Sequence, residues 1–450
     1  MKTQIESDLA RLEDLLENER IDKAQAHLLD RHPSEIAYLA NHVSMGFRHM
    51  LMPMIKASPS LVEIVYRLHP ELVKDLLGMM QAPQVGRLFS EMESDDAVKI
   101  LTNLPEELAH WVTSHVPAED SGQFDLLMQY EEDQAGRIMT PYYFAIHEEA
   151  TVYEAFGALR QSTDAESIYN IYVIDDRRHL VGVLSLRELL THPNQVKVKE
   201  FMNEQVISVS DRADQEDAAL TVERAGLSAV PVVNELNQLM GIITVDDVIH
   251  VIRTETTEDI MKLAGTTGGE YSLPSPMRGF LRRTPWLMVS FFGGMMTIQT
   301  NLFFASKVPH IELLAFVTII AGMGGNIASQ SSTIVVRGLA TGKILTSELW
   351  QVLFRETVTG MMLGLFFGGL LAMVASFQFS EFAVIGFSVF TGMLISMLIA
   401  AVVGSMMPMI FEHFHVDPAV ATGPFVSTTI DNLGLLGYFS SILLILKFAN

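Results

Sequence analysis

The 450-residue sequence contains no cysteine. This absence excludes disulfide bonds, thiolate metal sites and cysteine nucleophiles. Basic residues are also scarce, since 30 lysines and arginines stand against 53 aspartates and glutamates and leave a formal net charge of −23. A chain this acidic repels phosphate backbones, so nucleic-acid binding is not expected, whereas cationic partners are. Simple solubility is the competing explanation of the excess of acids.

The C-terminal part of the chain has few charges of either sign. Residues 284–450 contain seven acids and five lysines or arginines, whereas residues 1–283 contain 46 and 25, a net charge of −21. From Pro285 onward, apolar runs recur at the ~20 residues that a helix needs to cross a ~30 Å hydrocarbon core. They predict five membrane spans, with Gly404 and Pro408 marking the end of the fourth: about 285–305, 311–336, 353–377, 382–410 and 418–446.

Basic residues near the spans predict their orientation. Arg282 and Arg283 precede the first span, and Arg337, Lys343 and Arg355 cluster between the second and the third. Because basic residues collect on the cytoplasmic side of a membrane, the N-terminal part should be cytoplasmic. After five spans the C-terminus should then be extracytoplasmic. We expect a multi-pass protein of a bacterial inner membrane.

A sequence repeat is visible in the cytoplasmic part. The stretch "NIYVIDDRRHLVGVLSLRELL" from Asn170 matches "AVPVVNELNQLMGIITVDDVI" from Ala229, and two stretches before them, from Ile138 and from Phe201, match in the same order. Each copy predicts a short strand, a helix, a buried apolar strand, a turn, a second strand ending at Gly182 or Gly241, and a closing helix. The pattern resembles a pair of cystathionine-β-synthase (CBS) domains over roughly residues 138–252.

CBS pairs often bind adenine nucleotides. By this resemblance, "GIITVDD" offers Thr244 for a phosphate and Asp247 for ribose hydroxyls. The competing interpretation is that the two residues cap and begin the following helix, where hydroxyl and carboxylate side chains are favoured.

Helices are expected on both sides of the repeat. Residues 1–130 show apolar spacing of i, i+3 and i+4 between prolines, which predicts an all-α, superhelical array. After the repeat, residues 246–265 predict one uninterrupted helix on which Glu255, Glu258 and Asp259 share a face. A cation bound there would offset the repulsion among the three carboxylates, whereas a solvated face is the competing interpretation.

Two membrane spans carry polar groups that lipid disfavours. The second span contains "GMGGNIASQSST", in which Asn326 and Gln330 lie on one helix face. The fifth contains Asp431, with no basic residue within a helical turn or two. A carboxylate within a span costs roughly 2.5–3.5 kcal/mol and is expected to face a bundle interior or a water pathway. A protonated or amide-bonded structural aspartate is the competing interpretation.

The residues before Asp431 predict a particular ion chemistry. Pro418, Gly423 and Pro424 predict an interrupted helix, whose free carbonyl oxygens would lie near the acid. Carboxylate and carbonyl oxygens suit a hydrated Mg²⁺ or Ca²⁺, and a ring of such acids, one from each subunit, would form a cation filter.

Together these features resemble the MgtE family of magnesium channels and transporters. The resemblance covers nearly the whole chain, through "YEEDQAGRIMTP" before the CBS pair, "TTEDIMKLAG" after it, and spans that carry "GMGGNIASQSST" and "DPAVATGPFVSTTID". It implies a multidomain membrane protein. An enzyme is not expected, because the sequence shows no convergent set of acid, base and nucleophile. The implied segments are a helical N-domain (1–130), a CBS pair (131–252), a plug helix with its linker (253–276) and a transmembrane pore domain (277–450).

The resemblance also implies partners and site residues. It implies a homodimer in the lipid bilayer, transported and regulatory Mg²⁺, and ATP at the CBS pair. Asp431 carries over as the pore aspartate, and Glu255, Glu258 and Asp259 as the acids of a plug helix beside the pore. The resemblance also implies Mg²⁺ sites between the cytosolic domains that hold the pore closed at high internal Mg²⁺. The acidic cytoplasmic part offers further metal ligands, Asp95, Asp96, Asp246 and Asp247. The residues expected to line the pore are Gly325, Asn326, Ser329, Gln330, Glu356, Ser427 and Gly434.

The chain departs from the family pattern at several positions. Ala328 and Ser329 stand where Gly-Asn is common, and Gly423 stands where an asparagine often precedes the proline, so amides near the ion path are lost. Gly226 and His250 stand where well-known members have acids. Two alternatives therefore stay open: transport of another divalent cation such as Co²⁺ or Mn²⁺, and a nucleotide- or ion-sensing membrane receptor that does not conduct.

Overall fold

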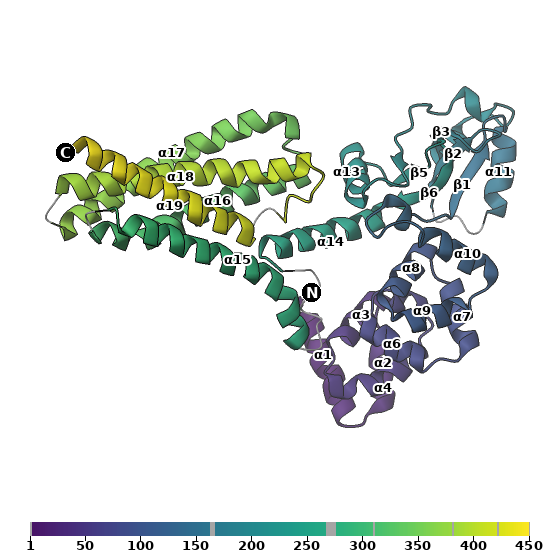
Figure 1. Ribbon diagram of the computed structural model, residues 1–450. Coiled ribbons are helices and arrows are strands. Elements are labelled where there is room, and N and C mark those ends of the chain that lie inside the picture. Colours follow the sequence, from purple (N-terminus) through teal and green to yellow (C-terminus); the bar gives the residue numbers. More distant parts are fainter. Residues whose placement is uncertain are drawn as a thin grey trace. The chain divides into compact units, whose positions relative to one another are not determined.

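The computed structural model describes residues 2–162, 167–266, 276–308, 311–379, 382–420 and 423–449 (Figure 1). The chain divides into two compact units, Met1–Val251 and Ile252–Asn450. The first combines a helical part with two small sheets, and the second is helical. The predicted fold class, a multidomain membrane protein with an all-α N-terminal part, an α+β repeat and five membrane helices, is confirmed.

Short amphipathic helices form the N-terminal part of the first unit. Pro33 and Pro70 lie in the first turn of their helices, where a missing N–H costs no hydrogen bond. Pro105 and Pro117 are N-cap residues of two others, so the prolines punctuate the chain at helix starts. The helices are α1 (Lys2–Glu17), α2 (Ile21–Leu29), α3 (Pro33–His42), α4 (Arg48–Lys56), α5 (Leu61–Val65), α6 (Pro70–Gly78), α7 (Ala82–Ser90), α8 (Ser94–Asn103), α9 (Glu106–Thr113) and α10 (Ala118–Leu127).

Two three-stranded sheets confirm the predicted repeat. Their strand orders are β1-β2-β3 and β4-β5-β6, and in each the first pair is parallel and the second antiparallel. The strand β5 is buried along its whole length, as its continuous apolar run predicts. The strands are β1 (Tyr143–His147), β2 (Ser167–Ile174), β3 (Leu180–Ser185), β4 (Val209–Ser210), β5 (Ala229–Val233) and β6 (Leu239–Thr244), and the helices among them are α11 (Val152–Gln161), α12 (Leu186–Thr191) and α13 (Gln215–Ala225).

The expectation that a strand ends at Gly182 or Gly241 is wrong. Both β3 and β6 continue beyond the glycine. A Cβ on Gly182 would lie 2.5 Å from Met202 Sδ, and a Cβ on Gly241 would lie 2.7 Å from the carbonyl oxygen of Thr140. The glycines therefore allow other segments to pack closely on the sheet and do not turn the chain.

One helix, α14 (Val245–Leu263), begins in the first unit and ends in the second. It confirms the uninterrupted helix expected after the repeat. Asp246 and Asp247 lie in its first turn, where carboxylates interact favourably with the helix dipole. Acids of both units are therefore carried by one continuous backbone.

Among the described residues, five helices of the second unit are long and apolar enough to cross a membrane, as predicted. They are α15 (Pro276–Ala305), α16 (Val317–Ala340), α17 (Leu349–Gln378), α18 (Phe382–His413) and α19 (Gly423–Ala449). Two predicted starts are wrong, because α15 begins before residue 285 and α19 begins after residue 418. Hydropathy marks the part of a helix that suits lipid, so it misses the first turns of α15, which continue beyond that part. It also includes residues 418–420, which form a turn before α19.

The helix α18 is central to the bundle. It packs against α16, α17 and α19, while α15 lies along α19 (Figure 1). Ser388, Ser396 and Ser405 on α18 are completely buried. Small side chains of this kind let membrane helices approach closely, which replaces the hydrophobic driving force that lipid cannot supply.

The fourth span does not end at Gly404 and Pro408 as predicted, since α18 continues to His413. A Cβ on Gly404 would lie 2.5 Å from the carbonyl oxygen of Ala328 and 2.7 Å from its Cα. Glycine is therefore required by the close approach of α16 and not by a helix end. An internal proline is tolerated in a membrane helix where neighbouring helices enclose the freed backbone group.

We expect Gly404→Ala to destabilise the membrane part by about 1–3 kcal/mol, because the added methyl group overlaps the backbone of α16. The measurement is the thermal midpoint of the purified chain in detergent. The matched control is Gly369→Ala on α17, where an added Cβ meets no atom within 4 Å. Equal midpoints for the two variants would contradict this account of the packing.

Candidate functional site

Asp431 lies on α19, two turns from the start of the helix. Its side chain is half-buried and makes no hydrogen bond or ion pair with another residue that the structure describes. The neighbouring Asn432 is buried, and its Nδ2 donates to the carbonyl oxygens of Thr428 (2.8 Å) and Gly293 (3.3 Å). Asn432 thus fixes α19 against α15, and the carboxylate of Asp431 is left available to a ligand.

The start of α19 differs from the interrupted helix that the sequence predicts. The helix is regular from Gly423 to Asp431, because Pro424 lies in the first turn, where proline is tolerated. Hydroxyl groups donate to the carbonyl oxygens of this turn in three pairs: Ser427 to Gly423, Thr428 to Pro424 and Thr429 to Phe425. The described carbonyl oxygens of this turn are therefore not free, whereas residues 421 and 422, directly before it, lie outside the described residues.

Polar side chains follow one exposed face of α16. Asn326, Ser329, Gln330 and Thr333 are exposed in the protomer, and we call these four residues the α16 polar stripe. A Cβ added to Gly325 beside them would meet no atom within 4 Å. Amide groups that face lipid lack hydrogen-bond partners, which costs free energy. The stripe therefore requires water or protein against it.

The other predicted pore residues have different surroundings. Glu356 on α17 is buried and accepts a hydrogen bond from Ser331 Oγ at 2.8 Å. Gly434 is also buried, and a Cβ on it would lie 2.7 Å from Ser396 Oγ. Both residues thus pack against neighbouring helices of the same chain. Ser427 is half-buried in the first turns of α19.

The end of α14 contacts the loop between α18 and α19. Lys262 Nζ lies 2.7 Å from Glu258 Oε1 and 2.5 Å from Asp417 Oδ2. Burial raises the pKa of Asp259, and the nearby charge of Asp417 raises it further, while Lys262 and Arg337 act in the opposite direction. Acids from two different elements therefore meet around one lysine.

Asp417 is a residue of this group that sequence reasoning missed. Glu255, Glu258 and Asp259 lie on the second half of α14, and Asp417 comes from a separate loop. The signal that could have found it is an acid directly before Pro418 in a short connection between two spans. Ligands from a second element are what a metal site needs beyond one helix face.

A second group of carboxylates lies in the first unit, around the starts of α8 and α14. Burial, with the charges of Asp96, Asp247 and Asp246, raises the pKa of Glu93 to about 7. Burial also raises the pKa of Asp96 to about 6, although Lys99 opposes this shift. The four acids repel one another, and we call them the α8–α14 acid cluster. Sequence reasoning named its two α14 members and Asp96 but missed Glu93.

The predicted nucleotide residues lie at this same cluster. Thr244 is buried, and its Oγ1 donates to Asp246 Oδ1 and to Asp247 Oδ2. Burial raises the pKa of Asp247, and the hydrogen bond from Thr244 opposes that shift. Asp95, the remaining predicted ligand, is half-buried in the first turn of α8.

A cavity of about 470 Å³ opens beside Glu93. Four carboxylates are among its lining residues, which are Ser90, Glu91, Met92, Glu93, Glu119, Asp120, Gln123 and Tyr142. Across the described residues, no three histidine, aspartate or glutamate side chains converge closely enough to hold a metal ion. A cation at this acidic surface would therefore be held largely through its own water molecules, as Mg²⁺ often is.

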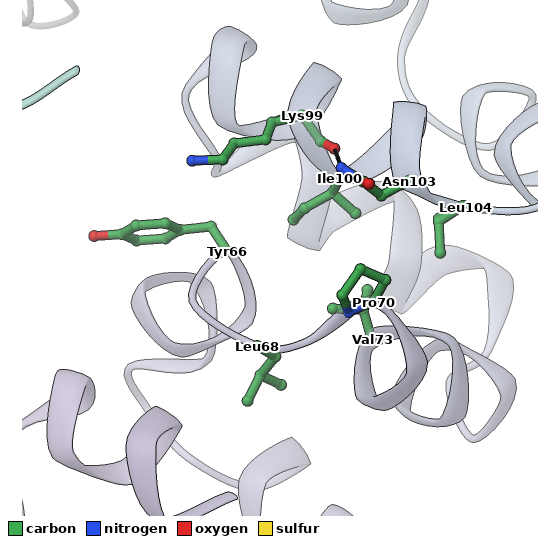
Figure 2. Close-up of a pocket in the computed structure, with 8 residues that line it drawn as sticks. All are labelled: Tyr66, Leu68, Pro70, Val73, Lys99, Ile100, Asn103 and Leu104. Atoms are coloured by element: carbon green, nitrogen blue, oxygen red, sulfur yellow. Dashed lines mark hydrogen bonds between the residues drawn. The ribbon is translucent and has the colours of Figure 1, made fainter. Parts of the chain in front are cut away.

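A smaller cavity of about 160 Å³ lies within the helical part (Figure 2). Figure 2 shows Tyr66 and Lys99 on one side of it and Pro70, Val73 and Leu104 on the other. Its lining is mainly apolar and includes no carboxylate, so it does not suit a metal cation.

Comparisons with known proteins agree over most of the chain. Family models match residues 31–133 (the MgtE intracellular N domain), 135–194 and 198–254 (CBS domains) and 317–441 (the MgtE divalent cation transporter). The magnesium transporter MgtE of Thermus thermophilus is 32% identical over 423 residues, which are 92% of this chain and 93% of that protein. The chain belongs to the MgtE family.

Other MgtE proteins are similar over shorter parts. The magnesium transporter MgtE of Enterococcus faecalis is 37% identical over 325 residues, 72% of this chain and 71% of that protein. A crystal structure of the cytosolic domain of the Mg²⁺ channel MgtE in complex with ATP is 30% identical, with a TM-score of 0.49 over 54% of this chain and 99% of that chain. As an MgtE-family chain with five candidate spans, the protein is a multi-pass membrane protein that handles divalent cations.

We expect this MgtE-family chain to lose stability as pH rises when divalent cations are removed. The pKa of Asp96 in the folded chain, about 6, is above its ordinary value of 3.8, so the folded state binds a proton more tightly than the unfolded state does. The resulting stability is present below about pH 4 and is lost as pH rises through about 6. Asp96→Asn should remove on the order of 2 kcal/mol of this pH dependence.

The measurement is denaturant unfolding in the presence of a chelator, followed through the fluorescence of Trp111 in a chain whose other two tryptophans, Trp286 and Trp350, are replaced by phenylalanine. Asp125→Asn changes an exposed acid of α10 and is the control, which should keep the wild-type slope. An Asp96→Asn variant with the wild-type pH slope would rule out this role for the α8–α14 acid cluster.

Proposed function

We propose that the chain is a homodimeric Mg²⁺ channel or transporter of the bacterial inner membrane, with its N-terminus cytoplasmic and its C-terminus extracytoplasmic. The observation that carries the proposal is the carboxylate of Asp431, which has no partner among the described residues and lies on a membrane helix packed against α16. The names of the similar magnesium transporters support Mg²⁺ as the ion.

A second copy of the chain would complete the pore. The α16 polar stripe faces outward from the protomer, where lipid would leave its amide groups without hydrogen bonds. A twofold-related copy would instead place two stripes and two Asp431 carboxylates around one water-filled path. Exposed aromatic residues on other helices, such as Phe291 and Phe366, suit contact with lipid.

The chemistry of such a path suits a hydrated divalent cation. Mg²⁺ prefers oxygen ligands and releases its water reluctantly, so one carboxylate from each subunit would hold it through bound water. Two carboxylates facing the path would repel anions and stabilise a divalent cation where the membrane is least polar. The amides and hydroxyls of the α16 polar stripe would accept or donate hydrogen bonds to the water shell of the ion.

Gating by cytosolic Mg²⁺ is the second part of the proposal. We assign sensing to residues 1–130 and 131–252, a plug to residues 253–276 and conduction to residues 277–450. Two like charges at 4 Å repel by about 4 kcal/mol at an effective dielectric constant of ~20. Mg²⁺ at the α8–α14 acid cluster, or at the plug acids Glu255, Glu258 and Asp259, would offset such repulsion and favour a compact, closed state.

ATP is a further proposed ligand of the CBS pair, in contact with Thr244 and Asp247. Because these side chains are hydrogen-bonded to each other and belong to the region of the acid cluster, ATP and Mg²⁺ would affect each other's binding there. Co²⁺ or Mn²⁺ is the alternative cargo. A receptor that does not conduct is less well supported, because a simple membrane anchor has no need of Asp431.

Asp431→Ala and Asp431→Asn should both abolish Mg²⁺ uptake into liposomes, by at least about 100-fold, the factor that corresponds to losing ~3 kcal/mol of ion stabilisation. Asparagine preserves the volume of the side chain, so its failure would identify charge as the cause. Thr391→Ala is the control, because its hydroxyl donates, within the part of the chain that the structure describes, to carbonyl oxygens of its own helix. Wild-type uptake by Asp431→Asn would show that the pore lies elsewhere.

Neutralising the plug acids together, as Glu255→Gln, Glu258→Gln and Asp259→Asn, should keep the channel open at internal Mg²⁺ concentrations that close the wild type. The reason is that the bound cation loses its charged ligands while the pore residue Asp431 is unchanged. The measurement is channel current across a titration of internal Mg²⁺. Closure at the wild-type concentration would exclude these acids as part of the gate and would leave the pore assignment intact.

A further inference from the structure

Lys262 lies at the centre of the contact between α14 and the α18–α19 loop. Its ammonium group is 2.7 Å from Glu258, one turn earlier on α14, and 2.5 Å from Asp417 in the loop. Its side chain is only 24% exposed. A lysine ammonium group is charged at neutral pH, and here two carboxylates from separate elements neutralise it.

This is also the position that a divalent cation would take between the same two carboxylates. Glu258 and Asp417 supply oxygen atoms from two separate elements, as a hard cation requires. An ammonium group and a hydrated divalent cation neutralise the same negative charges, so the presence of one weakens the binding of the other.

The backbone at this contact is packed against the start of α19. Gly423 has a φ of +49°, and a Cβ on it would lie 2.9 Å from the carbonyl oxygen of Leu263. Gly265, with a φ of +73°, lies so close to Pro424 that an added Cβ would be 3.0 Å from its ring. The end of α14 and the first turn of α19 are therefore held together, and Asp431 lies two turns further along α19.

We propose that Lys262 is a built-in counter-ion of the plug: it joins Glu258 to Asp417 when no divalent cation is bound, and a divalent cation must displace it. The lysine thereby sets the Mg²⁺ concentration at which the plug responds. This inference rests on the proposed gating by cytosolic Mg²⁺ and adds the competing cation that belongs to the chain itself.

A purely structural salt bridge makes a different prediction. If Lys262 forms only a structural salt bridge, removing it should loosen the plug contact at every Mg²⁺ concentration. More Mg²⁺ would then be needed to restore the contact. A displaced counter-ion requires the opposite, since the carboxylates of Glu258 and Asp417 then become available to the metal. Two ion pairs of partly exposed groups together correspond to about a tenfold change in an equilibrium constant.

The experiment uses the full-length chain in detergent, titrated with MgCl₂. Because the chain has no cysteine, Ile260→Cys on α14 and Phe414→Cys at the end of α18 accept two spin labels at exposed positions without side reactions. The distance between the labels, measured by pulsed electron paramagnetic resonance, reports the plug contact. Lys262→Met should lower the Mg²⁺ concentration at half-response by about tenfold.

Matched variants separate charge from side-chain packing. Lys262→Arg keeps the charge and should keep the Mg²⁺ concentration at half-response of the wild type. Lys262→Gln also removes the charge and should show the same tenfold decrease, so it replaces Lys262→Met if the methionine variant folds poorly. Lys307→Met removes the same net charge elsewhere, from an ammonium group 3.6 Å from the ring of Phe303, and should leave the half-response unchanged.

Three outcomes would overturn the inference. First, Lys262→Met and Lys262→Gln could need as much Mg²⁺ for half-response as the wild type, or more. Lys262 would then be a structural bridge, and gating by Mg²⁺ would still be supported. Second, an equal shift in Lys307→Met would assign the effect to net charge. Third, the distance between the labels in the wild-type chain could stay the same at every Mg²⁺ concentration. This result would exclude the proposed gating at the plug together with this inference. Mg²⁺ uptake that depends on Asp431 would still support the proposed pore.

Discussion

A carboxylate inside a membrane-spanning helix, without a basic partner among the described residues, is the constraint on which the membrane part depends. Such a group costs roughly 2.5–3.5 kcal/mol against lipid, so the fold must give Asp431 an aqueous or ionic neighbour. Asn432 fixes the orientation of α19 against α15, and the small residues of α18 let α16 and α19 pack closely on it. The α16 polar stripe has the same need for water or protein, and the proposed ion path would meet both needs.

The acids of the N-terminal part also carry negative charges that lack enough nearby positive charge. In the α8–α14 acid cluster, burial and mutual repulsion raise the pKa values of Glu93 and Asp96 far enough that proton binding relieves part of the strain. Near the end of α14, Lys262 forms ion pairs with Glu258 and Asp417. In the proposed gating, a divalent cation bound at each group would relieve the repulsion there, and α14 carries members of both groups.

The elements with a local signal were predictable from the sequence. Apolar length predicted five spans, and the repeat predicted two similar sheets. Contacts between distant segments were not predictable, because no local sequence pattern indicates them. Lys262 forms an ion pair with Asp417, 155 positions away, and the buried Glu356 accepts a hydrogen bond from Ser331. Helix ends were misplaced where glycine or proline has another purpose, as at Gly404, which admits the backbone of α16.

The unbroken course of α14 also fixes an angular relation between its two groups of acids. Asp247 and Glu258 are 11 residues apart on this helix. At 3.6 residues per turn, 11 residues make about three whole turns, so the two carboxylates lie along one line of the helix, roughly 16 Å apart. A rotation of α14 about its own axis would turn both by the same angle, Asp247 relative to α8 and Glu258 relative to Asp417. One residue more or fewer between them would put them out of phase by about 100°, so the length of this segment matters as much as its charges.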